Sequence, residues 1–239
     1  MKNLSKKYGL CIALVACILP ACVKKPAVVT QPQVVTGPTV RDTDGNVYHT
    51  ITIGSQVWMV ENLKTTHYRD GTPIVNASDS SSWVNNTDGA YCDYNNTLSN
   101  SSIYGRLYNW YAATNSHNIC PKGWHVPSEA EWSTLFTYLG GVSVAGGKLK
   151  ETGTAHWTNP NAGATNESGF SALPGGFRSG NGKLFSGKFF SLGQYGVWWS
   201  QTEQNTGNAW DFNITYTISY IESNDNAESD GYSVRCVKD

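Results

Sequence analysis

The stretch WHVPSEAEW, residues 124–132, places a histidine and two glutamates within seven residues of one another. His125 could accept a proton while Glu129 or Glu131 donates one, which is the division of work in general acid–base catalysis. The spacing favours a structural interpretation instead. Ser128 and Glu131 stand three residues apart, as in a capping box, where each side chain bonds a backbone N–H group at the start of a helix.

An amphipathic helix is predicted directly after this capping box. Four apolar residues follow at the spacing that places them on one helical face: Trp132, Leu135, Phe136 and Leu139. Gly140-Gly141 is typical of a helix end. Glu129 falls in the first turn, where its charge meets the positive end of the helix dipole. The block therefore predicts a connection from a short strand to a helix, with His125 a hydrogen-bonded, half-buried side chain.

The other candidates for chemistry form no catalytic or metal-binding pattern. The five histidines are spread along the chain, at His49, His67, His117, His125 and His156. Their spacings to serine, cysteine and acidic residues match neither a catalytic triad nor a zinc-binding helix. The net charge of −1 gives no electrostatic footprint for nucleic acid. We predict no catalytic residue, no metal, no cofactor and no nucleic-acid partner.

The first 22 residues predict a secreted lipoprotein. Lysines precede an apolar run, residues 10–19, that is too short for a stable membrane helix but typical of a secretory signal. The run ends in Leu19-Pro20-Ala21-Cys22, which resembles the bacterial lipobox. Residues 1–21 are therefore predicted to be a signal peptide and Cys22 to carry the lipid. Multiple acyl chains hold a protein stably at a membrane, which makes the membrane a predicted partner.

The segment after the lipidation site predicts a tether. Residues 22–40 are rich in Pro, Val and Thr without a helical or alternating period, which is typical of an extended, flexible linker. Lys24-Lys25 occupy the place where some surface lipoproteins carry an acidic export tag. We therefore expect an outer-membrane lipoprotein of the cell envelope, on a leaflet that the sequence leaves open.

Three cysteines remain once the signal peptide and Cys22 are set aside: Cys92, Cys120 and Cys236. In an oxidising envelope, two of them are expected to pair. A Cys120–Cys236 bridge would close a loop of more than one hundred residues. In the chain-entropy model such a bridge stabilises a protein by about 4–5 kcal/mol. We favour this pair and leave Cys92–Cys236 as the alternative.

The chain beyond the tether, residues 41–239, predicts a single α+β domain that opens with a β-hairpin and contains two or three short helices and a loop-rich antiparallel sheet. Strands are expected at residues 47–53, 57–60, 196–200, 209–220 and 232–237, and a helix at 104–113 in addition to the capped one. Asp42–Asn46 is expected to be a turn and not a calcium loop.

Polar stretches at residues 70–103 and 221–231 predict surface loops, and long loops often bind ligands. The tryptophans expected in the core are Trp124, Trp132, Trp198 and Trp199. Those expected to be partly exposed are Trp83, Trp157 and Trp210.

Seven blocks along the chain form a more specific pattern than any single motif. They are WMVENL, DGAYCDYNN, YGRLYNWYAA, CPKGWHVPSEAEW, FSALPGGFR, YGVWWSQTE and GYSVRCVKD. In this order they resemble the Fibrobacter succinogenes major paralogous domain family, from about Val47 to Asp239. The resemblance implies a C-type-lectin-like fold and agrees with the lipobox, because the family occurs mainly on secreted proteins and lipoproteins.

The same resemblance argues against one activity. The block WHVPSEAEW is also similar to a block in formylglycine-generating-enzyme-like domains, which share that fold. Those enzymes use a pair of cysteines near the C-terminus, where this chain has only Cys236. Family members with four domain cysteines pair an equivalent of Cys92 with a cysteine shortly downstream, and that partner is absent here.

Together these observations predict a non-catalytic, lipid-anchored binding module whose ligand is a carbohydrate or an envelope protein. Amide and carboxylate groups can bond sugar hydroxyls, while an aromatic ring can stack on the C–H face of a sugar. The binding candidates are Trp83, Trp210, Asp211, Asn213, Asp225 and Asp230. A structural or adhesin component of the outer envelope is the alternative, and an enzyme on a formylglycine-generating-enzyme-like fold ranks third.

Overall fold

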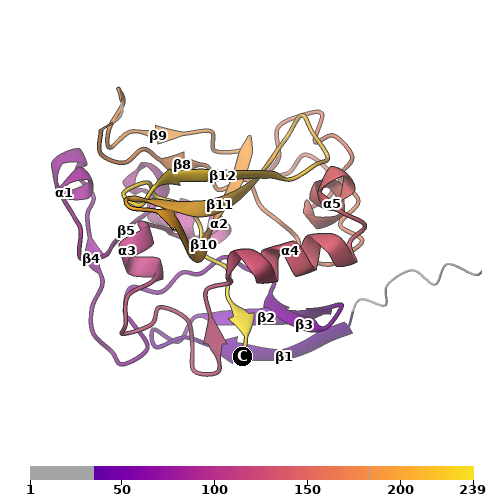
Figure 1. Ribbon diagram of the computed structural model, residues 1–239, viewed down its shortest axis with the longest axis horizontal. Helices are drawn as coiled ribbons and strands as arrows, with labels where there is room; N and C mark the ends of the chain where they lie inside the picture. Colours follow the sequence, from indigo (N-terminus) through magenta and orange to yellow (C-terminus); the bar gives the residue numbers. More distant parts are fainter. Residues whose placement is uncertain (1–34, 183) are drawn as a thin grey trace, which may run out of the picture. The chain divides into compact units, whose positions relative to one another are not determined.

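The structure is a computed structural model that describes residues 35–182 and 184–239 (Figure 1). Within these ranges the chain forms thirteen strands and five α-helices, so the predicted α+β class is confirmed, although two or three helices were too few. The predicted signal peptide (residues 1–21), Cys22 and tether residues 22–34 lie outside the described residues. In the ranges that the structure describes, every helix is too short or too polar to cross a membrane.

A five-stranded antiparallel sheet joins the two ends of the domain. In spatial order its strands are β1 (Val35–Arg41), β2 (Val47–Ile53), β3 (Gln56–Met59), β13 (Val237–Lys238) and β7 (Trp124–His125). The predicted hairpin is confirmed as β2 and β3. The last strand, β13, lies between the hairpin and the strand of the WHVPSEAEW block.

Strand β1 corrects the predicted extent of the tether. Residues 35–40 were expected to be flexible, yet they pair with β2. Strand β2 would otherwise present an open edge, and the Val and Thr side chains of this segment suit an extended strand. Pro38 cannot donate a backbone hydrogen bond, and it falls where the register shifts between Gly37 and Val40. The folded domain therefore includes residues 35–40.

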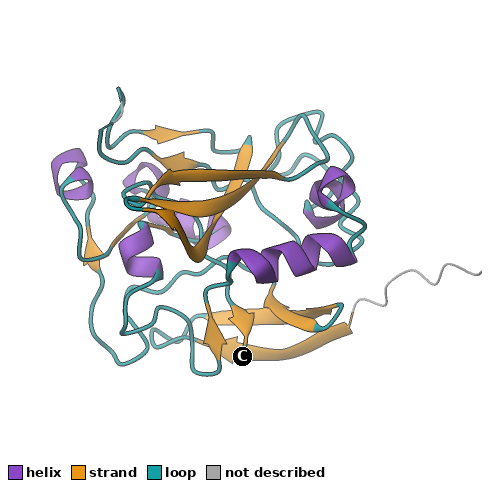
Figure 2. Cartoon of the chain, in the orientation of Figure 1, coloured by secondary structure: helices purple, strands orange, loops and turns teal. Residues whose placement is uncertain are grey.

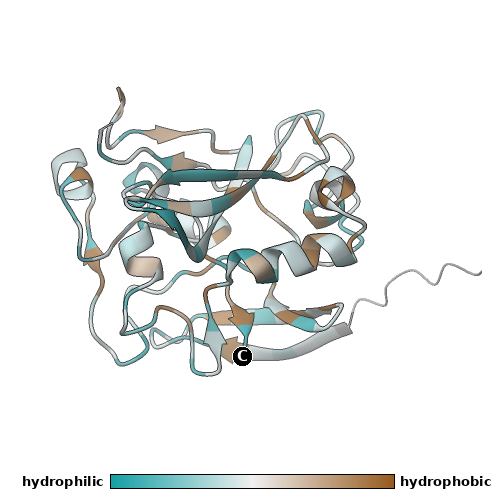
Figure 3. Cartoon of the chain, in the orientation of Figure 1, coloured by the Kyte–Doolittle hydropathy of each residue, from teal (hydrophilic) through white to brown (hydrophobic). Residues whose placement is uncertain are grey.

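A second antiparallel sheet consists of β10 (Tyr195–Asn205), β11 (Asn208–Thr215) and β12 (Glu222–Ala227), in that order. The predicted strand at 209–220 ends earlier, at Thr215, and the one at 232–237 is reduced to isolated bridges before β13. Strand β12 lies within the predicted loop 221–231, so that prediction was wrong. Its residues are hydrophilic (Figure 3), but an edge strand pairs through its backbone and needs no apolar pattern.

Helix α4 (Glu129–Tyr138) lies between the two sheets in Figure 1. The capping box of Ser128 and Glu131 is confirmed. Trp132 packs against Trp58 of β3, with ring centroids 4.7 Å apart, and against Phe212 of β11 at 5.5 Å. The predicted apolar stripe and the four predicted core tryptophans are buried. Beyond Gly140-Gly141 the chain continues as α5 (Val142–Leu149).

Much of the predicted loop at 70–103 folds into short elements (Figure 2). They are β4 (Val75–Asn76), α1 (Ser80–Val84), β5 (Ala90–Cys92), the 3-10 turn η1 (Tyr94–Asn96) and α2 (Leu98–Tyr104). The prediction of a surface loop was wrong here because Trp83 and Cys92, which are both fully buried, attach the segment to the core.

The helix predicted over residues 104–113 was also wrong. Gly105 has a φ of 80°, in the left-handed region, and ends α2. The chain then forms β6 (Leu107–Tyr108), which pairs with β5. Only α3 (Trp110–Ala113) is helical, with the Asn109 side chain accepting a hydrogen bond from the Ala112 N–H as its cap. Two further short strands, β8 (Phe177–Arg178) and β9 (Phe189–Phe190), pair with each other.

The disulfide joins Cys120 and Cys236, which confirms the favoured pairing and excludes the alternative. It connects the segment before β7 to the residue before β13, 116 positions along the chain. Cys92 is buried and forms no disulfide.

Candidate functional site

His125, the first candidate for chemistry, connects the last residue of the chain to helix α4. Its Nδ1 lies 2.7 Å from Asp239 and its Nε2 lies 2.8 Å from Glu131. Burial acts to lower the pKa of His125, but hydrogen bonds to the two carboxylates outweigh burial and leave this pKa raised. Burial alone would raise the pKa of Glu131, which is lowered on balance because the backbone N–H and hydroxyl of Ser128 bond its carboxylate. The expectation of a hydrogen-bonded, half-buried histidine is confirmed.

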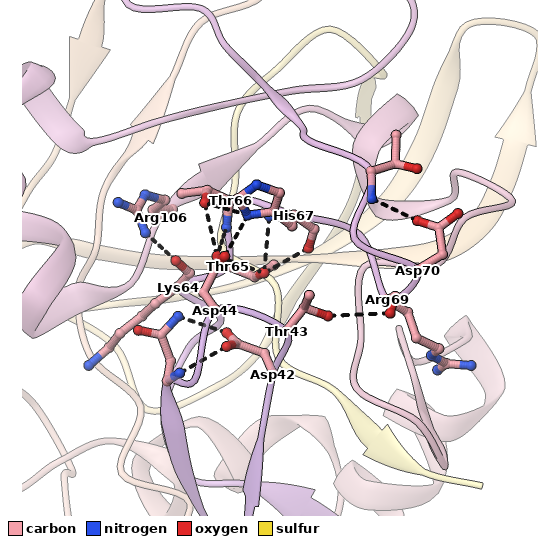
Figure 4. A network of polar contacts seen from close by, with 12 residues as sticks. Asp42, Thr43, Asp44, Lys64, Thr65, Thr66, His67, Arg69, Asp70 and Arg106 are labelled. Carbon is pink, nitrogen blue, oxygen red and sulfur yellow. Dashed lines mark hydrogen bonds and ion pairs between the residues drawn. The ribbon is translucent and has the colours of Figure 1, made fainter.

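The other four histidines also each contact a carboxylate. The pairs are His49 with Glu61, His67 with Asp44, His117 with Asp70, and His156 with Glu151. Asp44 additionally accepts hydrogen bonds from the Thr65 and Thr66 hydroxyls (Figure 4). The neighbouring Asp42 accepts from Asn46 and from the Tyr48 hydroxyl, so the predicted turn is confirmed. Asp42 and Asp44 therefore hold the loops around the first strands together.

Cys92 is placed for packing. Burial raises the pKa of its thiol to about 12, and a thiol must be a thiolate to act as a nucleophile or metal ligand. In the ranges that the structure describes, no three His, Cys, Asp or Glu side chains gather closely enough to hold a metal ion.

A pocket of about 340 Å³ lies on the second sheet, on the face turned away from α4. The alternation of the strands creates it. Trp198 and Phe212 are opposite each other in the register and pack towards α4, while the next pair, Val197 and Asn213, faces the other side. The pocket is lined by Phe177, Tyr195, Val197, Asp211, Asn213, Asn226 and Tyr232. It combines aromatic walls with carboxylate and amide groups. We call it the sheet pocket.

The polar groups of the sheet pocket are buried to different degrees and serve different purposes. Asn213 is 7% exposed, and its Oδ1 has no hydrogen-bond partner among residues 35–182 and 184–239. The Asn226 Nδ2 donates to Asp211 Oδ2 over 2.7 Å. A buried acceptor without a donor costs free energy unless a ligand or water supplies the missing bond. Asn213 is therefore the group in this pocket that most clearly requires a donor from outside the protein.

Asp230 does not line the sheet pocket, but it positions Tyr232, one of the aromatic residues that do. It accepts hydrogen bonds from the Tyr232 hydroxyl at 3.1 Å and from the Gly180 N–H at 2.6 Å. Burial, followed by the charges of Asp230 and Asp211, raises the pKa of Tyr232 well above its ordinary value. The hydroxyl therefore stays protonated and keeps donating to Asp230, which fixes the orientation of the ring at the pocket.

The structure brings together only part of the predicted binding set. Asp211 and Asn213 line the sheet pocket, and Asp230 supports it. Trp210 is partly exposed, as predicted, but it pairs with Asp225 at the register position that faces away from the pocket. Neither residue is among those that line it.

Trp83 and Trp157 were wrongly predicted to be partly exposed. Trp83 is fully buried, with the Arg178 guanidinium 4.8 Å from its ring centroid. Trp157 is 1% exposed and donates a hydrogen bond from Nε1 to the Ala172 carbonyl at 2.9 Å. Both stand in polar sequence without a period, where nothing local indicates that the ring turns inward.

The pocket residues that sequence reasoning missed are Phe177, Tyr195, Val197, Asn226 and Tyr232. Three of them are aromatic residues in glycine-containing stretches that read equally well as core. One available signal is strand alternation, because Tyr195 and Val197 share a face, as do Asp211 and Asn213. The inclusion of Phe177 and Tyr232 follows only from the packing of other segments against this sheet.

Comparison with family models matches residues 51–238 to the Fibrobacter succinogenes major domain. This range covers most of the chain and includes every residue of the sheet pocket. Searches of the curated proteins and of the solved structures return no significant match.

Proposed function

The chain belongs to the Fibrobacter succinogenes major domain family, and on that premise we propose that it is a non-catalytic carbohydrate-binding module held at the cell envelope by a lipid on Cys22. The observation that carries the proposal is the buried, unsatisfied Oδ1 of Asn213 in a pocket with aromatic walls. Such an oxygen needs a hydrogen-bond donor, and sugars present donors on every hydroxyl.

The composition of the sheet pocket supports a sugar over other small ligands. A pyranose has hydroxyl groups at its edge and C–H groups on its faces, so it needs polar partners and apolar surface side by side. Asn213, Asn226 and Asp211 supply the polar partners, while Phe177 and Tyr195 supply partly exposed rings. A concave site with a few placed polar groups among aromatic side chains is typical of specific small-ligand binding.

The binding is proposed to be direct and not through calcium. Calcium takes six to eight oxygen ligands, usually including several carboxylates. Asp211 is the single carboxylate among the residues that line the sheet pocket, and one of its oxygens accepts the Asn226 amide. The C-type-lectin-like fold implied by the family resemblance remains part of this proposal, without the calcium-dependent mode of sugar binding.

The anchor is the second half of the proposal. The lipobox-like Leu19-Pro20-Ala21-Cys22 follows an apolar segment typical of a signal peptide. Lipidation at Cys22 would hold the domain at the outer membrane through residues 22–34. Growth with radiolabelled palmitate tests it: the wild-type chain is expected to incorporate label and the Cys22→Ala variant to lose it. Equal incorporation by the two chains would remove the anchor from the proposal.

The binding function is tested on a glycan array with the full chain, in buffer with calcium and in buffer with EDTA. We expect glycan binding in both buffers, its loss in Asn213→Leu and its retention in Asn205→Ala. Asn205 is an exposed amide of the same sheet outside the pocket, which makes it a matched control. An array with no bound glycan, or binding that survives Asn213→Leu, would disprove the assignment of the pocket.

A second candidate function, assembly with an envelope protein, is favoured by one surface feature. Near the junction of α4 and α5, four apolar or aromatic side chains are between 42% and 52% exposed: Tyr138, Val142, Val144 and Tyr220. The Ile221 N–H donates to the Val142 carbonyl at 2.9 Å, so the last of these lies beside the start of α5. Clustered apolar exposure is typical of interaction surfaces. Cross-linking of the anchored chain in cells tests this candidate, and a Val142→Ser variant that cross-links unchanged would count against it.

A further inference from the structure

The sheet pocket continues into a row of phenylalanine rings. Phe177, which lines the pocket, is the register partner of Phe190 across β8 and β9, and their ring centroids lie 5.5 Å apart. Phe185, in the loop between these strands, lies 6.0 Å from Phe190. On the pocket side, the ring of Phe177 is 6.5 Å from Tyr195 and 6.2 Å from Tyr232. We call Phe177, Phe190 and Phe185 the aromatic strip.

The strip is open to solvent although the neighbouring aromatic residue is used for packing. Phe185 is 58% exposed, and Phe177 and Phe190 are partly exposed. Phe189 points the other way, with its ring 4.6 Å from the Arg178 guanidinium and 5.2 Å from Tyr94. Figure 3 shows β9 as hydrophobic, in contrast to the hydrophilic β12. Three open rings in series, leading into a polar pocket, form a surface that a ligand would cover favourably.

We propose that the ligand is a chain of sugars, with one residue in the sheet pocket and the following residues stacked along the aromatic strip. This inference rests on the proposed carbohydrate-binding function and adds to it the class of ligand, an oligosaccharide or polysaccharide. Successive sugar residues each present an apolar face, and the exposed or partly exposed rings of the aromatic strip follow one another at centroid distances of 5.5 and 6.0 Å.

The chemistry of the pocket favours a sugar chain over a proline-rich peptide, the other extended ligand that binds aromatic surfaces. Proline has no backbone N–H and offers only acceptors. The Asn213 Oδ1 in the sheet pocket is itself an acceptor and needs a donor. Hydroxyl groups supply that donor, whereas proline-rich segments place carbonyl oxygens against it. The strip supplies contact area to either ligand, and the pocket decides between them.

The experiment compares ligand lengths by calorimetry on the full chain. The probes are glucose with cello-oligosaccharides of two to six residues, and N-acetylglucosamine with the corresponding chito-oligosaccharides. In at least one series we expect the affinity to rise with length over the first three or four residues. Phe185→Ala and Phe190→Ala are each expected to lower the affinity for the longer probes by about 2- to 10-fold, as one aromatic contact would, and to leave the single-sugar affinity unchanged.

Two controls separate this inference from the proposal on which it rests. Leu184→Ala removes the neighbouring apolar side chain, which is 90% exposed and outside the strip, and is expected to change nothing. Asn213→Leu is expected to lower the affinity for every length. Two results would disprove the role of the aromatic strip and leave the role of the sheet pocket intact. One is binding of single sugars without any effect of length, and the other is full length dependence in Phe185→Ala and Phe190→Ala. Binding of a polyproline peptide that depends on Phe185, with no sugar bound, overturns both.

Discussion

The most direct test of the sheet pocket is a comparison of two buried asparagines that have opposite hydrogen-bond states. Asn213 is 7% exposed and its Oδ1 has no partner in the described part of the chain. Asn62 is 3% exposed, and its Oδ1 accepts from Trp198 Nε1 at 2.8 Å and from Arg235 Nε and Nη2 at 3.1 and 2.8 Å. The same change, asparagine to leucine, is therefore expected to alter the free energy of unfolding in opposite directions.

Asn213→Leu is expected to raise the free energy of unfolding. A buried acceptor without a hydrogen bond costs about 1–3 kcal/mol, and the substitution removes that acceptor. Leucine also suits a strand better than asparagine does, and the pocket has space for the larger side chain. For a domain of this size, each kcal/mol corresponds to about 2–4 °C in Tm. The variant should thus melt several degrees above the wild type while losing its glycan signal.

Asn62→Leu is expected to lower stability strongly. It would leave Arg235, a fully buried cation, without its side-chain acceptor, and breaking a buried charged interaction of this kind costs about 3–5 kcal/mol. Thermal and urea unfolding of the two variants, followed by tryptophan fluorescence, measure both effects. If Asn213→Leu destabilises as much as Asn62→Leu does, Asn213 is a structural residue and its free oxygen is no mark of a ligand site.

Three further predictions concern stability and reactivity. Replacing Cys120 and Cys236 together by alanine is expected to lower the free energy of unfolding by about 4–5 kcal/mol, since the loop spans 116 residues; an unchanged urea midpoint would contradict this. The raised pKa of His125 contributes stability that is fully present below its unfolded value of 6.5 and is lost as the pH rises through the folded pKa. The lowered pKa of Glu131 contributes stability that is present above 4.5 and is lost as the pH falls through its folded pKa. The gap in Tm between wild type and His125→Ala should therefore be largest between about pH 4.5 and 6.5, and a gap that widens towards pH 8 would refute the assignment. Cys92, with a pKa of about 12, should resist iodoacetamide at pH 8 in the folded protein and react in guanidinium; rapid labelling of the native chain, detected by mass spectrometry, would show that the thiol is accessible.

Part of the structure follows from the sequence because it depends on neighbours along the chain. The capping box at Ser128, the apolar stripe that follows it and the hairpin of β2 and β3 are local patterns, and the structure confirms each one. The same local character explains the errors. Strand β12 and the buried Trp83 stand in polar sequence, where only a partner from a distant segment shows which side chains turn inward.

The composition of the sheet pocket was decided by the tertiary structure alone. Sequence reasoning identified Asp211 and Asn213 as candidates, but not the residues that complete their site. Phe177 comes from β8 and Tyr232 from the segment before β13. They meet because this segment pairs with β10 through Ser233 and Trp198, and with β8 through Gly231 and Arg178. Strand register decides which residues of a strand share a face, and a shift of one position would turn Asn213 towards α4. Register and packing arise from contacts between segments distant in the chain, so no local pattern could predict that an unsatisfied amide would lie among these rings.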